Sequence, residues 1–197
     1  MWEERYKTPD YLFGTEPARF LKTHEALLTA PQTALSVADG EGRNSVFLAQ
    51  KGLSVTALEY APSAIAKAKA LAAARGVQVA FCEADVLTYP FEETYDMVLG
   101  IFIQFLGPEA RAVLFERMKA AVKPGGLMLL HGYTPEQIAF QTGGPPQAEN
   151  MYTEDLLKDA FPDWTLLTCQ AYEAEISEGT GHAGRSALID FIARKPA

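Results

Sequence analysis

A glycine-containing turn at residues 38–44 constrains this chain more than any other feature of its sequence. The apolar stretch before it, residues 33–37, is typical of a short buried strand, and residues 43–51 have the pattern of a helix. Gly40 and Gly42 permit the positive φ angles of a tight turn and leave the backbone bare for a ligand. The unpaired N–H groups at the start of the helix favour a carboxylate or phosphate. Strand, Gly-x-Gly turn and helix predict the opening of a nucleotide-binding α/β domain, although a plain strand-to-helix turn fits the same residues.

The charges inside the turn narrow the choice of ligand. Asp39 and Glu41 would repel a pyrophosphate, by about 4 kcal/mol each as an upper-end value for ~4 Å and an effective dielectric of ~20. Ser45 stands where the dinucleotide fingerprint has its third glycine. The same acids would attract the ammonium and sulfonium of S-adenosylmethionine, so the sequence favours a methyl donor over NAD. A nicotinamide-dependent oxidoreductase and a noncatalytic domain that binds adenosylmethionine are the alternatives.

The composition indicates one globular domain over residues 1–197, because 48% of the residues are hydrophobic. A net charge of −8 disfavours nucleic acid, so a small-molecule methyl acceptor is expected. The N-terminus lacks an apolar signal region and the longest apolar run, 97–106, is too short for a bilayer. We therefore expect a cytoplasmic protein with no membrane partner. Cys82 and Cys169 are expected to be buried thiols, not a disulfide or metal pair, and the sequence does not indicate the oligomeric state.

The rest of the chain alternates between strand and helix patterns. Strands are expected at 53–59, 77–82, 95–102 and 127–130, with helices at 18–28, 62–75, 108–122 and 153–161. Residues 164–175 and 186–194 predict two further strands, joined by a loop at 179–185 as an antiparallel hairpin. The fold class is therefore α/β, a single doubly wound, seven-stranded and mostly parallel sheet with a C-terminal antiparallel hairpin. Residues 2–14 form an irregular arm, either a flap over the site or a segment packed on the outside, and 135–152 form a long loop.

Several side chains fall where such folds bind ligands, at the carboxyl ends of the strands. Glu59 ends the second strand and is predicted to hold ribose hydroxyls. Asp85 follows the third strand and is predicted to accept a bond from an adenine amino group, with Val86 packed on the ring. Gln104 follows the fourth strand, whereas His131 at the end of the fifth is expected to be structural.

Taken together, these stretches resemble the class I S-adenosylmethionine-dependent methyltransferases, and more narrowly the small bacterial tellurite-resistance and thiopurine methyltransferase types. The resemblance runs nearly end to end. Its motifs are Trp2-x-x-Arg-Tyr6, Gly14-Thr-Glu-Pro17, Ala38-Asp-Gly-Glu-Gly-Arg-Asn44, Ile101-Phe-Ile-Gln-Phe105, Lys123-Pro-Gly-Gly126, Gly132-Tyr-Thr-Pro-Glu-Gln137, Thr142-Gly-Gly-Pro-Pro146 and Ala193-Arg-Lys-Pro196. The family's opening acid is replaced by Ser36 and its first glycine by Ala38, so Asp39 is a candidate for the ammonium contact.

The resemblance implies S-adenosylmethionine as the cofactor and methyl transfer to a small nucleophile such as a thiol or a chalcogen oxyanion. Orientation of the two reactants is worth roughly 7–11 kcal/mol in such a displacement. A hydroxyl or amine acceptor would need a base, for which His182 is the candidate, while Arg185 would hold an anionic acceptor; an inert polar loop is the alternative for both. The predicted catalytic residues are His182, Arg185 and Gln104. The predicted cofactor-binding residues are Tyr11, Ala38, Asp39, Gly40, Gly42, Glu59, Tyr60, Asp85, Val86 and Ile101.

Overall fold

The computed structural model describes residues 2–30 and 32–197. These residues form two compact units. The first comprises the chain up to Tyr89 together with Glu178–Gly181, and the second comprises Pro90–Ser177 and His182–Ala197. The single domain over residues 1–197 stays a prediction.

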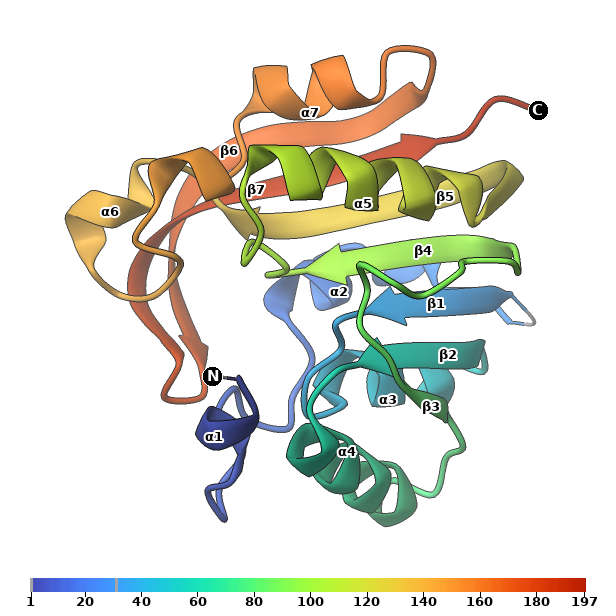
Figure 1. Cartoon of the computed structure of the whole chain (residues 1–197), viewed down its shortest axis with the longest axis vertical. Coiled ribbons are helices and arrows are strands. Elements are labelled where there is room, and N and C mark those ends of the chain that lie inside the picture. The colour runs from blue at the N-terminus through green and yellow to red at the C-terminus, as the bar shows by residue number, and fades with distance from the viewer. Residues whose placement is uncertain (1, 31) are drawn as a thin grey trace. The chain divides into compact units, whose positions relative to one another are not determined.

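The first unit is built on three parallel strands with helices beside them (Figure 1). The strands lie in the order β3-β2-β1, and the register places Leu35 opposite Thr56 and Leu58 opposite Cys82. A cluster of Val46, Leu71 and Ala72 packs the two longer helices of this unit together. Its elements are α1 (Trp2–Tyr6), α2 (Arg19–Thr23), the 3₁₀ helix η1 (Glu25–Leu27), β1 (Thr33–Val37), α3 (Arg43–Gln50), β2 (Ser54–Glu59), α4 (Pro62–Ala74) and β3 (Ala80–Glu83).

The second unit has strands in the order β4-β5-β7-β6, with β5 parallel to β4 and antiparallel to β7. Tyr133, Met151, Ile176 and Leu188 form one of its buried clusters. Its elements are β4 (Tyr95–Ile101), α5 (Pro108–Ala120), β5 (Val122–Tyr133), α6 (Gln137–Phe140), the 3₁₀ helix η2 (Ala148–Asn150), α7 (Glu154–Ala160), β6 (Thr165–Glu178) and β7 (His182–Arg194). The full strand order, β3-β2-β1-β4-β5-β7-β6, confirms the predicted seven-stranded, mostly parallel α/β sheet with antiparallel strands at its C-terminal end.

Several element boundaries differ from the prediction. The helix expected at 18–28 is broken at His24 into α2 and η1. The third strand begins at Ala80, not at 77, because the Val77 N–H donates to the Ala72 carbonyl and so belongs to the end of α4. The fifth strand is longer than 127–130 and contains a register irregularity opposite Tyr95 and Met97. The arm begins with a helix, α1, where irregular chain was expected.

The two cysteines are free, and both are half-buried, which corrects the expectation of buried thiols. Among the described residues, no helix is long and apolar enough to cross a membrane. The same residues contain no group of three or more His, Cys, Asp or Glu side chains arranged to hold a metal ion.

Candidate functional site

The turn after β1 needs three residues in the left-handed region. Gly40 and Gly42 have φ angles of 66° and 88°, and Ala38 has a φ of 51°. A left-handed backbone costs a residue with a Cβ about 1–2 kcal/mol, so Ala38 carries strain that a glycine would not. Gly42 is also required by packing, because a Cβ there would lie 2.7 Å from the Cβ of Ala68 on α4. The turn is therefore pressed closely against the neighbouring helix.

Asp39 stabilises the turn through hydrogen bonds of its backbone and its side chain. Its N–H donates to the Leu58 carbonyl at 2.9 Å, and its carboxylate accepts hydrogen bonds from the hydroxyls of Ser36, at 2.6 Å, and Ser45. Burial raises the pKa of Asp39 to about 6, an effect that the hydrogen bonds from the serines oppose and the charge of Glu59 assists. Ser36 thus points its hydroxyl at the acid three residues on. Asp39 as an ammonium contact stays a prediction.

Glu59, at the end of β2, lies against the same turn. One carboxylate oxygen accepts the Gly40 N–H at 2.8 Å, and the other accepts the N–H groups of Tyr60 and Ala61, both at 2.9 Å. The side chain is buried, whereas Tyr60 is 64% exposed. Glu59, the residue predicted to bind the ribose, therefore lies beside the glycine turn. Its hydrogen bonds also fix the shape of that turn.

The segment after β3 belongs to this cluster through its backbone. The Ala84 N–H donates to the Glu59 carbonyl at 2.9 Å, which ties the segment to the end of β2. Asp85 is exposed and accepts the Leu87 N–H at 2.9 Å, and Val86 is buried. The first unit thus brings together the turn, Glu59 and the Asp85–Val86 pair that the sequence had placed at one site.

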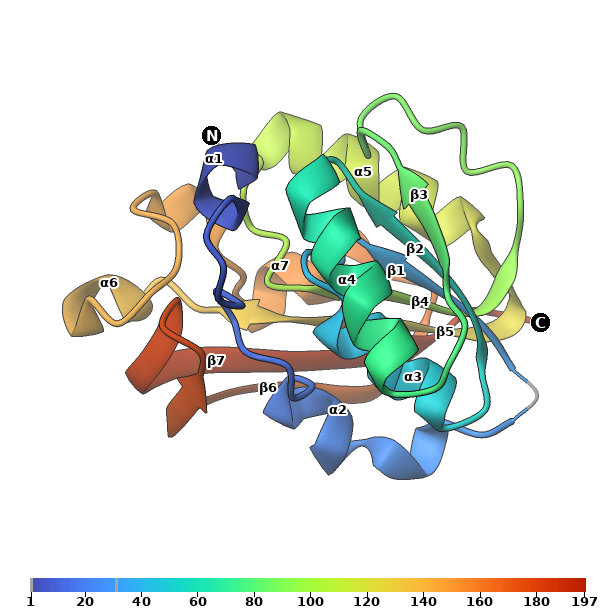
Figure 2. The same cartoon turned by 90° about the horizontal axis from the view of Figure 1, so that it is seen from below.

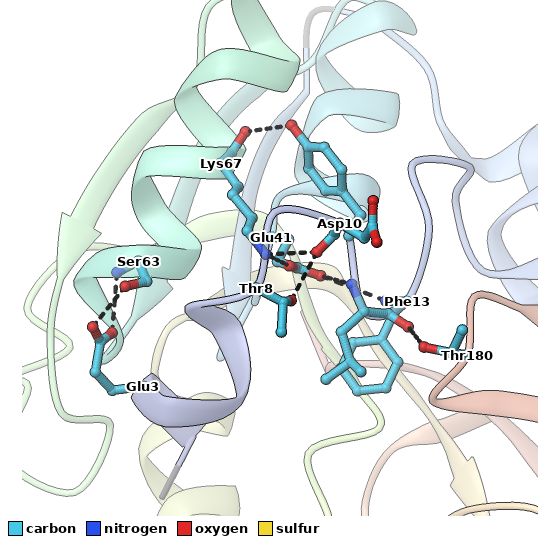
Figure 3. Close-up of polar contacts among 10 residues, drawn as sticks. Glu3, Thr8, Asp10, Phe13, Glu41, Ser63, Lys67 and Thr180 are labelled. Carbon is cyan, nitrogen blue, oxygen red and sulfur yellow. Dashed lines mark hydrogen bonds and ion pairs between the residues drawn. The ribbon is translucent and has the colours of Figure 1, made fainter.

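The other polar residues of the turn hold neighbouring segments in place. Glu41 forms an ion pair with Lys67 at 2.7 Å and accepts the Leu12 N–H at 2.8 Å (Figure 3). Arg43 forms an ion pair with Glu178 at 2.8 Å, and the side chains of both are nearly buried. Because Lys67 neutralises Glu41, the sequence argument from repulsion of a pyrophosphate is weaker than expected. The preference for a methyl donor must rest on other observations.

The aromatic residue of the arm that reaches the turn is Tyr6. A Cβ on Gly40 would lie 3.1 Å from the Tyr6 hydroxyl, and burial raises the pKa of this phenol, with the charges of Glu59 and Glu41 adding to the effect. Tyr11, the predicted cofactor contact, instead donates to the Lys67 carbonyl at 3.0 Å and packs beside Val46 and its neighbours. The sequence indicated an aromatic arm but gave no signal for which ring faces the turn. Tyr11 as a cofactor contact stays a prediction.

The predicted acceptor residues in the second unit are only partly together. The side-chain amide of Gln104 forms two hydrogen bonds with the backbone of Tyr133. The Gln104 NH₂ donates to the Tyr133 carbonyl and the Gln104 amide oxygen accepts the Tyr133 N–H, both at 2.7 Å. His182 is buried with its ring 4.1 Å from that of Phe102 and 5.6 Å from that of Tyr133. Gln104 and His182 therefore share Tyr133 as a neighbour.

Arg185 is not part of that group. Both His182 and Arg185 lie in β7, which corrects the prediction that they sit in a connecting loop. Three residues apart in a strand, they point to opposite faces, so one is buried and the other exposed. The Arg185 guanidinium pairs with Glu173, with Nε at 3.0 Å from the carboxylate oxygen.

Two features near the end of β4 were not found from the sequence. Phe102 has a φ of 57°, a strained conformation of the kind that clusters at functional sites, and its ring contacts His131, Tyr133 and His182. His131 lies 2.8 Å from Asp190, which also accepts the Tyr172 hydroxyl at 3.0 Å. Ile101 is the last residue of β4 and pairs with His131. No local sequence pattern marks a left-handed phenylalanine, and Asp190 is remote from His131 along the chain.

Residues 34–126 match the family model described as a methyltransferase domain. The chain is 28% identical over 189 residues to hemagglutinin 1 of Eikenella corrodens, covering 88% of this chain and 60% of that protein. It is 23% identical over 176 residues to a probable S-adenosyl-L-methionine-dependent methyltransferase, TehB, of Haemophilus influenzae, covering 86% of this chain and 59% of that protein.

Solved structures show the same fold. The crystal structure of TehB from Haemophilus influenzae superimposes with a TM-score of 0.72 at 20% identity, covering 98% of this chain and 65% of that one. The N-methyltransferase NodS of Bradyrhizobium japonicum, in complex with S-adenosylhomocysteine, gives 0.72 at 14% identity, covering 100% and 97%. The chain thus spans about three fifths of the length of hemagglutinin 1 of Eikenella corrodens and of the curated TehB sequence.

Proposed function

We propose that this chain, whose residues 34–126 match a methyltransferase domain and whose fold is that of the class I S-adenosylmethionine-dependent methyltransferases, catalyses methyl transfer from S-adenosylmethionine. One observation carries the proposal. The glycine turn, the carboxylate of Glu59 and the Asp85–Val86 segment are joined by hydrogen bonds within one unit. Three features fit an adenosyl group: backbone without a side chain, an acid for a vicinal diol, and an acid next to an apolar side chain.

The residues present suit this cofactor. Glu59 would hold the ribose hydroxyls, Asp85 the adenine amino group and Val86 the ring, while Gly40, where an added Cβ would meet the Tyr6 side chain, would present its backbone to the amino-acid end. When bound, the cofactor supplies a methyl group on a positively charged sulfur. The protein then needs chiefly to align the acceptor with that methyl carbon.

We propose a small nucleophile as the acceptor, with a thiol or a chalcogen oxyanion favoured because neither needs a general base. The net charge of −8 supports a small molecule over a nucleic acid. His182 remains the candidate base for a hydroxyl or amine acceptor, and its contact with the strained Phe102 supports a functional role. Arg185 would have to leave Glu173 to bind an anion.

Binding measurements test the cofactor first. Thermal-shift and calorimetric titrations with adenosylmethionine, adenosylhomocysteine and NAD should show stabilisation by the first two and none by NAD. Stabilisation by NAD alone would favour an oxidoreductase.

The acceptor requires a screen of thiols, selenite and tellurite, with release of adenosylhomocysteine as the readout. With an acceptor identified, His182→Ala should lower turnover and spare cofactor affinity, the pattern of a group that acts on the acceptor. Tight binding of adenosylmethionine without turnover of any acceptor would favour a noncatalytic binding domain.

A further inference from the structure

The backbone of the arm at Leu12 and Phe13 is held from two directions (Figure 3). On one side, a single carboxylate oxygen of Glu41 accepts the N–H groups of Leu12, at 2.8 Å, and Phe13, at 3.5 Å. On the other side, the Leu12 carbonyl accepts the Gly181 N–H at 3.1 Å and the Thr180 hydroxyl at 3.4 Å. These two residues of the arm therefore lie between the glycine turn and the tip of the β6–β7 hairpin.

The second oxygen of Glu41 is held by Lys67, and this ion pair is shielded from water. The side chain of Glu41 is 1% exposed and that of Lys67 is 16% exposed. The Lys67 ammonium also donates to the carbonyl of Asp10, at 2.7 Å, so it binds the arm directly as well as through Glu41. The side chains of Glu41 and Lys67 thus bind three of the four residues 10–13, namely Asp10, Leu12 and Phe13. The fourth, Tyr11, donates its hydroxyl to the Lys67 carbonyl.

The other end of the arm covers the turn and is fastened to α4. Tyr6 is buried beside Gly40, and its ring packs with Trp2 and Phe13. Glu3 accepts the N–H and the hydroxyl of Ser63 at 3.0 and 2.6 Å. Figure 2 shows α1 next to the start of α4. A ligand that approaches the bare backbone at Gly40 must therefore share that space with Tyr6.

From this geometry we propose that Glu41 is a positioning residue: its carboxylate, held by Lys67, locks residues 10–13 of the arm in place and so keeps Tyr6 over the glycine turn. We call the contacts of Glu41 and Lys67 with residues 10–13 the latch. Opening of the latch would set the rate at which adenosylmethionine and adenosylhomocysteine enter and leave. Control of cofactor entry and release by the latch rests on the proposed function, whereas the latch itself does not.

The first experiment tests the latch without any ligand. Hydrogen exchange at Leu12 and Phe13 should be about tenfold to a hundredfold faster in Glu41→Gln, the factor expected when hydrogen bonds to a charged group are lost. Lys67→Met, which keeps Glu41 and the apolar stem, should also speed exchange there. Glu25→Gln, which removes the exposed ion pair with Lys51 outside this region, is the matched control and should leave the arm unchanged. Unchanged exchange at Leu12 and Phe13 in both latch variants would overturn the proposal.

The second experiment tests the gate. Release of adenosylhomocysteine, followed by stopped flow, should be several-fold faster in Glu41→Gln and Lys67→Met than in wild type or Glu25→Gln. A purely structural role would lower the melting temperature and leave the release rate unchanged. Faster arm exchange with unaltered release would therefore refute the gate. A wild-type protein that binds no adenosylhomocysteine would overturn the gate together with the proposed function, while faster exchange in the variants would still establish the latch.

Discussion

Replacing Gly42 by alanine should destabilise the protein through a contact that the structure defines. Gly42 has a φ of +88°, and an added Cβ would lie 2.7 Å from the Cβ and 2.8 Å from the Cα of Ala68. The left-handed backbone costs about 1–2 kcal/mol and overpacking against α4 about 1–3 kcal/mol. The reduced freedom of the unfolded chain offsets about 0.4–1 kcal/mol of this. The free energy of unfolding should fall by about 1–5 kcal/mol.

Gly76→Ala is the matched control, because Gly76 has a φ of +67° and nothing lies within 4 Å of an added Cβ. Only the backbone term acts there, so the expected loss is about 0–2 kcal/mol. Thermal and urea unfolding followed by circular dichroism would measure both, and 1 kcal/mol corresponds to about 2–4 °C for a chain of this size. Equal losses in the two variants would show that α3 and α4 separate to admit the methyl group. Close packing would then not be the reason for glycine at position 42.

Three further changes probe the turn and its surroundings. Ala38→Gly relieves about 1–2 kcal/mol of strain against about 0.4–1 kcal/mol of added unfolded-state entropy, so the melting temperature should rise slightly or stay level; a clear fall would contradict the strain. Burial raises the pKa of Asp39 to about 6. The protonated carboxyl group therefore contributes to the free energy of unfolding below about pH 4, and this contribution is lost as the pH rises from about 4 to about 6. Asp39→Asn should flatten that part of the profile of melting temperature against pH, and an identical slope in wild type and variant would remove Asp39 as its source. Glu59→Ala should weaken adenosylhomocysteine binding at least about tenfold by calorimetry, and unchanged affinity would end its assignment to the ribose.

The parts of the fold that were predictable are those determined by short-range patterns. β1 was predicted to the residue, and α3, β2 and α4 to within about one, because apolar runs, the glycine turn and Pro62 act locally. The same local logic placed Glu59 beside the turn, since both follow neighbouring parallel strands.

The direction of each charged side chain in the turn was not predictable. A carboxylate at position 41 can face a ligand or the protein, and the choice here depends on Lys67 and on backbone N–H groups of the arm. Likewise, Arg43 meets Glu178, a residue near the other end of the sequence. A long-range ion pair leaves no periodic signal, so the sequence did not indicate that Glu41 and Arg43 hold the surrounding chain.

The bond between Glu3 and Ser63 has a consequence for the kinetics of folding. Ala61 precedes α4 and offers no side-chain cap, so the free N–H of Ser63 depends on an acid some sixty residues earlier in the chain. Contacts between residues so distant in sequence form only after the loop between them has closed, which is slow relative to helix growth. The first turn of α4 is therefore expected to be frayed in the transition state and completed when the arm docks, so that arm substitutions change the unfolding rate more than the folding rate.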